Sequence, residues 1–133
     1  MTTNYYDTLI RIAEDSPVTV AEVPVAKNDK PTIASMQYDM VVNNPYKFTS
    51  DDVIFRIYAE RNHVEPNQTE REKYFSKGQP CFRSSPLGKR YGWGVHSDSE
   101  GKIAIYPADS SVYEHLANDP TVKQLKAMRS KRV

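Results

Sequence analysis

The sequence predicts an α+β fold in which four to five helices pack against a small antiparallel sheet. Three observations lead to this class: alternating apolar segments near residues 6–13 and 91–106, apolar residues at helical spacing between residues 31 and 77, and a length of 133 residues, which suits one domain. The hydrophobic fraction is only 38%, but nine Tyr, four Phe and one Trp add core volume. We therefore expect residues 1–133 to fold as a single domain.

The first predicted elements are extended. Residues 6–13 alternate with a period of two, which is typical of a strand. Residues 18–25 are also rich in β-branched side chains, but Pro24 has no backbone N–H to donate to a sheet. We expect either an edge strand or an extended arm there, followed by a polar loop at residues 27–30.

Two helices are predicted next, over residues 31–43 and 50–62. Pro31 suits the first turn of a helix, where its missing N–H needs no partner. Thr49 supplies a capping oxygen before the second helix, and two Asp residues follow it in the first turn. Apolar residues of this second segment also alternate as in a strand, and the cap decides for a helix.

A third helix is expected over residues 67–77. Thr69 and Glu72 have the spacing of a capping box, and Gly78 is placed to end the helix. From Gly78 to Gly88 no periodic pattern is present, so we expect an irregular segment.

A β-hairpin is predicted for residues 91–106. Two β-rich segments, 91–96 and 102–106, flank a polar turn whose Gly101 can adopt a positive φ. Trp93 is expected to lie in the core.

Two short helices are predicted to complete the chain, over residues 109–118 and 119–129. Asp119 and Pro120 have the pattern of an N-cap followed by proline in the first helical position. Residues 130–133 form a basic tail that we expect to fray.

Composition indicates a cytoplasmic protein without a membrane partner. A single cysteine excludes an intrachain disulfide and fits a reducing compartment. The first fifteen residues lack the charged and apolar regions of a signal peptide, and no apolar run approaches the roughly 20 residues that span a bilayer. The sequence does not indicate an oligomeric state.

Charge is unevenly distributed along the chain. Residues 1–70 carry a net charge of −5 and residues 71–133 one of +6, which leaves +1 overall. Residues 75–96 contain no acidic residue, but they hold the only Cys, the only Trp and the cations Lys77, Arg83, Lys89 and Arg90. Such a segment favours a positive local field. Two solvated faces of one domain would also explain the asymmetry.

One long string in this region carries a resemblance. The string SKGQPCFRSSPLGKRYGWGVH, with NPYKFTSDDVIFRIYAER upstream and EGKIAIYP and KAMRSKR downstream, resembles a family of small bacterial proteins of unknown function. The resemblance covers nearly the whole chain. It implies a single domain, and it implies no activity and no catalytic residue.

An anion site is the function that we favour from the residues. Concave sites often combine an irregular loop with a rigid element, and arginine, lysine and loop N–H groups suit phosphate or carboxylate. Gly92 and Gly94 would form the floor of such a cleft. The expected ligand-binding residues are Lys77, Gln79, Arg83, Ser84, Ser85, Lys89, Arg90, Tyr91 and Trp93. A purely structural loop with solvated cations is the simpler interpretation.

Two other functions stay open. Cys81 and His96 are candidate catalytic residues of a thiol-dependent enzyme, in which cations would lower the thiol pKa. Tyr91 and Trp93, with the basic tail, are candidates for stacking single-stranded nucleic acid. Whether the protein is an enzyme is therefore undecided. No metal site, P-loop or cofactor is expected, because the ligand spacings and the glycine pattern are missing.

Overall fold

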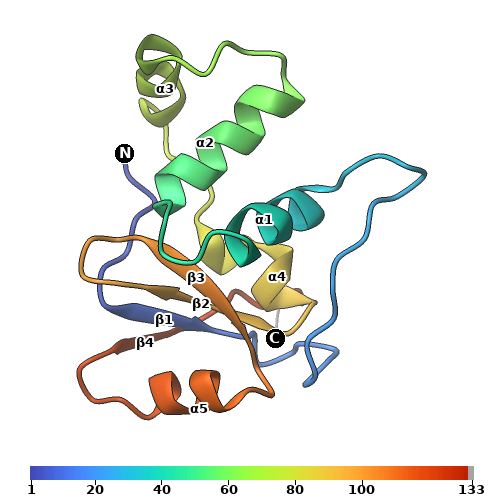
Figure 1. Ribbon diagram of the computed structural model, residues 1–133, viewed down its shortest axis with the longest axis vertical. Helices are drawn as coiled ribbons and strands as arrows, with labels where there is room; N and C mark the ends of the chain where they lie inside the picture. Colours follow the sequence, from blue (N-terminus) through green and yellow to red (C-terminus); the bar gives the residue numbers. More distant parts are fainter. Residues whose placement is uncertain (132–133) are drawn as a thin grey trace.

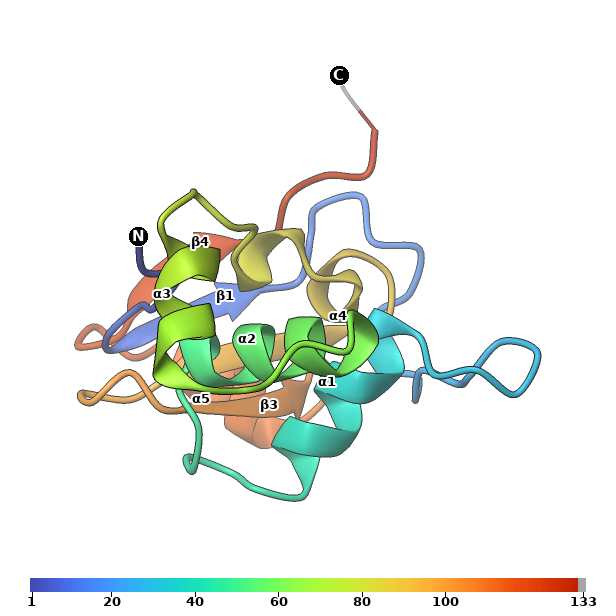
Figure 2. The same cartoon turned by 90° about the horizontal axis from the view of Figure 1, so that it is seen from above.

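A four-stranded sheet lies between two unequal layers of helices in the computed structural model, which describes residues 1–131 (Figure 1). Helices α1, α2 and α4 cover one face, α3 lies beyond α2, and α5 covers the opposite face, as the view from above also indicates (Figure 2). The helices are α1 (Ile33–Val42), α2 (Ser50–Arg61), α3 (Gln68–Phe75), α4 (Pro86–Lys89) and α5 (Ser111–Ala117), with a 3-10 turn η1 (Phe82–Ser84). The predicted α+β class is confirmed.

The sheet is mixed rather than purely antiparallel. Its strands β1 (Thr8–Arg11), β2 (Trp93–Ser97), β3 (Ile103–Pro107) and β4 (Lys123–Lys126) have the order β3-β2-β1-β4. The predicted hairpin is confirmed as β2 and β3, with Val95 opposite Ile105, and β2 also pairs antiparallel with β1. The fourth strand pairs parallel to β1, which places Ile10 opposite Leu125.

The predicted helix over residues 119–129 is wrong. The Asp119 carboxylate accepts hydrogen bonds from the backbone and hydroxyl of Thr121, at 2.8 and 2.7 Å, so it closes a turn instead of capping a helix. The chain then runs extended beside β1, where the Lys123 N–H donates to Asp7 and the Ala127 N–H to Arg11. Pairing with a free strand edge outweighs local helix propensity here.

Two predicted helix starts contain reciprocal caps. Thr49 and Asp52 exchange side-chain to backbone hydrogen bonds at the start of α2, which confirms the helix over residues 50–62. Thr32 and Ser35 do the same for α1, so this helix begins after Thr32 and Pro31 precedes the cap.

Helix α3 differs from its prediction at both ends. The Asn67 side chain caps it by accepting from the Glu70 N–H at 2.8 Å, so the predicted capping box of Thr69 and Glu72 does not form. The helix ends at Phe75, before Gly78, and Gly78 does not terminate it.

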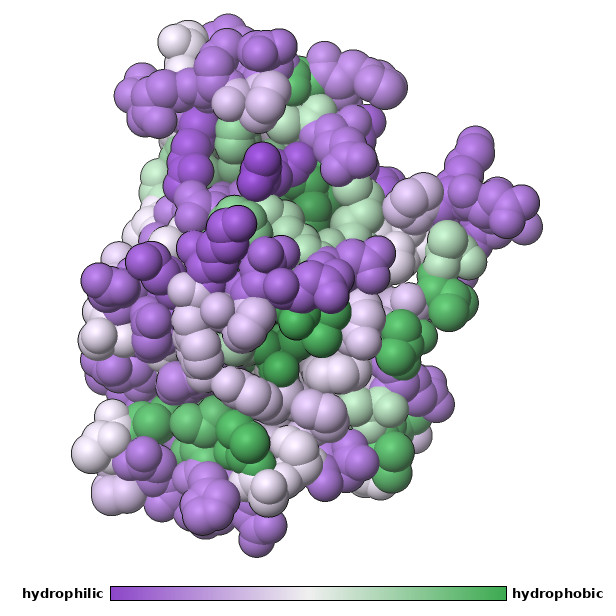
Figure 3. All heavy atoms as spheres, in the orientation of Figure 1, coloured by the Kyte–Doolittle hydropathy of each residue, from purple (hydrophilic) through white to green (hydrophobic). Residues whose placement is uncertain are grey.

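Residues 18–25 form an extended arm and not a strand of the sheet. The Glu22 N–H donates to the Tyr91 carbonyl at 2.8 Å, and the Glu22 carbonyl accepts from Trp93 Nε1 at 2.8 Å. Beyond these contacts the arm exposes Val20, Val23 and Val25, and hydrophobic spheres follow it at the right of Figure 3.

The main core lies between the sheet and the larger helical layer. Ile10 and Val95 point toward this layer, where Phe82 and Leu87 pack against them, and all four are at most 2% exposed. The intervening residues of each strand point toward α5, in keeping with the period of two along a strand.

The start of the basic tail is held by the acidic N-terminal half. The N–H groups of Ser130 and Lys131 donate to Asp15 at 2.9 and 3.0 Å, so these two residues are not frayed as predicted. Residues 132 and 133, the rest of the predicted tail, lie outside the described residues.

Candidate functional site

The acid-free segment, residues 75–96, does not gather its cations in one place. It runs from the end of α3 through η1 and α4 into β2. Lys77 lines a cavity beside α3, whereas Arg83 Nε donates to the backbone carbonyl of Lys126 at 2.9 Å. The other expected ligand-binding residues are also divided. Gln79 lines the same cavity as Lys77, Ser84 and Ser85 line a second cavity, and Arg90 and Tyr91 line a third. Lys89 is half-buried in α4, and Trp93 is buried.

Four cations meet at one of these cavities, which we call the basic hollow. It has a volume of about 360 Å³ and is lined by Lys27, Lys30, Arg61 and Arg90, with Tyr91, Pro86 and residues 31–34. No acidic side chain lines it, and none of the four cations forms a salt bridge with a carboxylate of residues 1–131. The hollow therefore holds positive charge that the described part of the chain leaves unpaired.

A tight turn places the two lysines of the basic hollow opposite each other. Lys27 and Lys30 exchange both backbone hydrogen bonds at 2.9 Å, and between them Asn28 and Asp29 have φ angles of 50° and 61°. Positive φ at both central residues is the requirement of a type I′ turn. Residues paired in this way carry their side chains on the same face, where like charges repel.

The two arginines come from the ends of helices. Arg61 ends α2, and its guanidinium donates to the Pro31 carbonyl at 3.3 Å, which ties it to the start of α1. Arg90 follows α4, and its N–H donates to the Pro86 carbonyl at 2.8 Å. Both side chains are exposed, so their guanidinium groups are free to contact a ligand.

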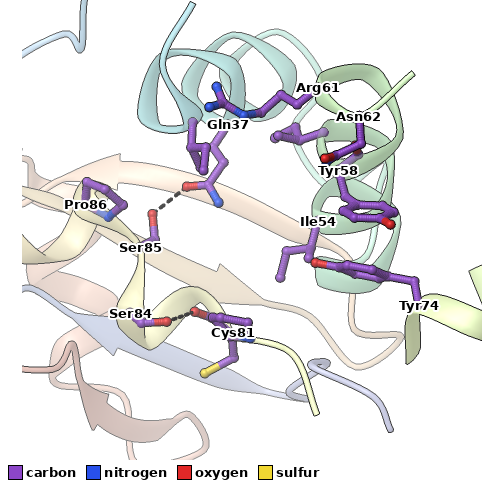
Figure 4. Close-up of a pocket in the computed structure, with 13 residues that line it drawn as sticks. Gln37, Ile54, Tyr58, Arg61, Asn62, Tyr74, Cys81, Ser84, Ser85 and Pro86 are labelled. Atoms are coloured by element: carbon purple, nitrogen blue, oxygen red, sulfur yellow. Dashed lines mark hydrogen bonds between the residues drawn. The ribbon is translucent and has the colours of Figure 1, made fainter. Parts of the chain in front are cut away.

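A second cavity, the apolar cleft, adjoins the basic hollow. Its volume is about 310 Å³, and one of its walls is the face of α2 that carries Ile54, Ile57, Tyr58 and Arg61. Residues 80–86 supply most of the opposite wall, and Figure 4 shows the open space between the two walls. The remaining lining residues are Ile33, Gln37, Asn62 and Tyr74.

One amide at the base of the apolar cleft keeps a free donor. Gln37 Oε1 accepts a 2.5 Å hydrogen bond from the Ser85 hydroxyl, and both residues are buried, with 7% and 4% of their surface exposed. The NH₂ group of Gln37 has no hydrogen-bond partner among residues 1–131, and Figure 4 shows it directed into the cleft. This donor opens onto the cleft, where it can bind an acceptor atom of a ligand.

The two candidate catalytic residues are not brought together. Cys81 lines the apolar cleft, and its Sγ lies 3.4 Å from the Tyr5 hydroxyl. His96 lies on the opposite face of the sheet, where its Nδ1 is 2.8 Å from the Tyr46 hydroxyl, which in turn is 2.9 Å from that of Tyr106. A thiolate–imidazole pair needs hydrogen-bond contact, and the sheet separates these two groups.

Two pKa values are shifted at these positions, that of Tyr5 beside Cys81 and that of His96 itself. Burial and the hydrogen bond to Cys81 raise the pKa of Tyr5 above its usual value. Burial lowers the pKa of His96 below 6.5, although the carboxylates of Asp98, Asp7 and Asp119 act in the opposite direction.

The aromatic residues proposed for base stacking offer no free ring pair. Trp93 is 7% exposed, as its predicted place in the core requires, and its ring packs edge-on against Tyr38 at 5.2 Å. Tyr91 is half-buried against the core. In the tail region, the Lys126 and Arg129 side chains bind Glu14 and lower its pKa to about 2.

Other parts of the chain cover the two glycines that were expected to form a cleft floor. Gly92, with φ of 81°, lies against Ala21, whose Cα would be 3.1 Å from an added Cβ. At Gly94 an added Cβ would lie 2.5 Å from the Tyr113 ring. The expected floor is therefore wrong, because these glycines permit close packing of the chain on itself.

Sequence reasoning missed four residues that the two cavities bring together: Lys27, Lys30, Arg61 and Gln37. Two lysines around Asn28-Asp29 are a signal for a turn that places them side by side. Arg61 follows Ile54 and Ile57 at helical spacing, which puts all three on one helix face. No local signal identified Gln37.

Residues 1–131 contain neither a cluster of metal-ligating side chains nor a helix that could span a membrane. No three His, Cys, Asp or Glu side chains gather there as a metal ion requires. No helix in that part of the chain has the length and hydrophobicity needed to cross a membrane.

Comparison with known proteins gives a family and no activity. A model with the description "Family of unknown function (DUF6157)" matches residues 1–133. No curated protein and no solved structure has significant similarity to the chain.

Proposed function

The chain belongs to the family of unknown function DUF6157, and because this family brings no activity with it we propose, on the geometry, that the protein binds a small anion in the basic hollow. The expected ligands are small molecules that carry a phosphate or a carboxylate group. A cytoplasmic location is part of the proposal, since the single cysteine fits a reducing compartment.

The observation that carries the proposal is the set of four unpaired cations around one cavity. Lys27 and Lys30 face each other across a two-residue turn, and Arg61 and Arg90 reach the same cavity from two helix ends. Like charges held together are unfavourable unless an anion neutralises them. A scattered set of solvated cations would not need the defined turn that aligns the lysines.

The residue types support binding of an oxyanion. An arginine guanidinium can donate two parallel hydrogen bonds to a carboxylate or phosphate, and a lysine ammonium adds a compact charge. The cavity volume of about 360 Å³ lies within the range of small-molecule sites.

Calorimetric titration with inorganic phosphate at low ionic strength tests the proposal. Arg90→Gln should weaken binding about tenfold, because a charge-assisted contact is lost. Lys27→Gln should weaken it by less, since a lysine ammonium cannot donate the two parallel hydrogen bonds that a guanidinium donates. Lys77→Gln is the matched control, because Lys77 is also exposed but lines another cavity.

Two results would overturn the proposal. One is that phosphate and acetate both release no heat and leave the melting temperature unchanged at high concentration. The other is that Lys77→Gln weakens binding as much as Lys27→Gln, since binding would then depend on net charge and not on the basic hollow.

A further inference from the structure

We infer that the ligand is an amphipathic anion whose charged group binds in the basic hollow and whose apolar body enters the apolar cleft. This inference rests on the proposed anion binding and adds the chemical class of the ligand. It is carried by the contact between the two cavities, the lining of the cleft and the free amide of Gln37.

The two cavities meet along shared side chains. Ile33, Arg61 and Pro86 line both of them. Ile33 is 46% exposed and Arg61 is also exposed, so a ligand can reach both side chains. A ligand that contacts the Arg61 guanidinium with its anionic group therefore lies at the mouth of the apolar cleft.

The lining of the apolar cleft suits an uncharged body. Ile54 and Ile57 are buried at its α2 wall, and the rings of Tyr58 and Tyr74 stack beside them at 4.2 Å. Arg61 is the one charged residue of this lining. Removal of apolar surface from water is the main favourable contribution that such a cleft can make to binding.

The Gln37 amide gives the cleft one directional contact. Its oxygen is held by Ser85, which leaves the NH₂ group to donate into the cavity. An oxygen atom on the ligand's body would satisfy this donor. Small-molecule sites commonly combine apolar walls with a few polar groups that orient the ligand.

The test is a series of straight-chain alkyl phosphates, from inorganic phosphate through methyl and butyl to hexyl phosphate, titrated by calorimetry. The affinity should rise about fourfold for each CH₂ group buried, until the cleft of about 310 Å³ is full. The neutral alcohol 1-hexanol should bind far more weakly than hexyl phosphate, because it lacks the group that the basic hollow binds.

A matched pair of variants locates the alkyl chain. Ile33→Gln changes an exposed residue at the mouth of the cleft, and Val112→Gln changes one of similar exposure, 43%, on α5. Ile33→Gln should reduce the gain from a longer chain, taken as the ratio of the affinities for hexyl phosphate and for inorganic phosphate, so that any change at the basic hollow, which Ile33 also lines, cancels. Val112→Gln should not change this ratio, and the melting temperatures of the unliganded variants report whether both remain folded.

The outcomes separate this inference from the proposed function. If inorganic phosphate binds and the longer alkyl phosphates bind with the same affinity, the amphipathic ligand is overturned and anion binding stays in place. Equal affinity for hexyl phosphate and 1-hexanol would overturn anion binding. A chain-length gain that Ile33→Gln leaves intact would place the alkyl chain outside the apolar cleft and overturn the inference.

Discussion

The two faces of the sheet are built in different ways. On the face toward α1, α2 and α4, large side chains such as Phe82 and Leu87 pack on Ile10 and Val95. On the face toward α5, the backbone of β2 approaches Tyr113 so closely that only glycine fits at position 94.

The difference follows from the number of helices on each face. Several helices meet over the first face at different angles (Figure 1). The apolar cleft and the basic hollow are lined by residues of α1, α2 and the segment 80–91, to which the turn at residues 27–30 is added at the basic hollow. One helix of seven residues, α5, covers part of the second face. On the same face, His96 forms a hydrogen bond with the Tyr46 hydroxyl. Cavities for a ligand therefore form on the thick side of the molecule, and close packing predominates on the thin side.

The largest expected effect concerns the thick side. Phe82→Ala removes a ring that is 2% exposed, and the resulting cavity should lower the free energy of unfolding by about 3–5 kcal/mol. Urea denaturation measures the change. Val112→Ala on α5, where the side chain is 43% exposed, should stay within about 0.5 kcal/mol of the wild type. If Phe82→Ala lowered the free energy of unfolding no more than an ordinary surface substitution does, the contrast between the two faces would be removed.

A smaller effect is expected from the contact on the thin side. Gly94→Ala adds a Cβ 2.5 Å from the Tyr113 ring, and the overpacking should cost about 1–3 kcal/mol in the free energy of unfolding. Gly78→Ala is the control, because its Cβ would meet Met1 Sδ at an ordinary 3.5 Å.

A double variant identifies the cause of that cost. Combined with Tyr113→Ala, which removes the ring, Gly94→Ala should cost less than it does alone, so the two changes are not additive. Additive costs in urea denaturation would show that the strain at Gly94 arises elsewhere.

The smallest expected effect is the pH dependence that His96 contributes. Burial lowers its pKa in the folded protein below 6.5, so below that pH the unfolded chain binds the proton more readily. The stability contributed by neutral His96 is therefore present above pH 6.5 and decreases as the pH falls through the lowered pKa.

Denaturation at pH 7.5 and pH 5.5 measures this contribution, since the two values bracket the ordinary pKa of about 6.5 for histidine. His96→Gln should lose less stability between these values than the wild type loses. His63→Gln, at an exposed position, should behave as the wild type does. An identical pH dependence in all three proteins would contradict a lowered pKa of the half-buried His96.

Elements with strong local signals were predictable from the residues. The cap formed by Thr49 and Asp52 is a contact between near neighbours, so the start of α2 follows from the sequence alone. The β2–β3 hairpin is likewise local, since one turn with Gly101 joins both strands.

Elements that depend on distant partners were not predictable in the same way. Asp119 and Pro120 predicted a helix over residues 119–129, but residues 123–126 pair with the free edge of β1, more than a hundred residues earlier in the chain, through hydrogen bonds that a local pattern cannot reveal. Residues 75–96 show the same limit, because their cations separate along α4 and η1 once these are packed on the sheet.

The residues by themselves determined the α+β class, the capped helices and an uneven distribution of charge. Tertiary structure alone decided that β4 is a strand and that Lys27, Lys30 and Arg61 meet Arg90 at one cavity. The physical reason is range: caps and turns form between neighbours in sequence, whereas edge pairing and the convergence of charges require segments that only the folded core brings together.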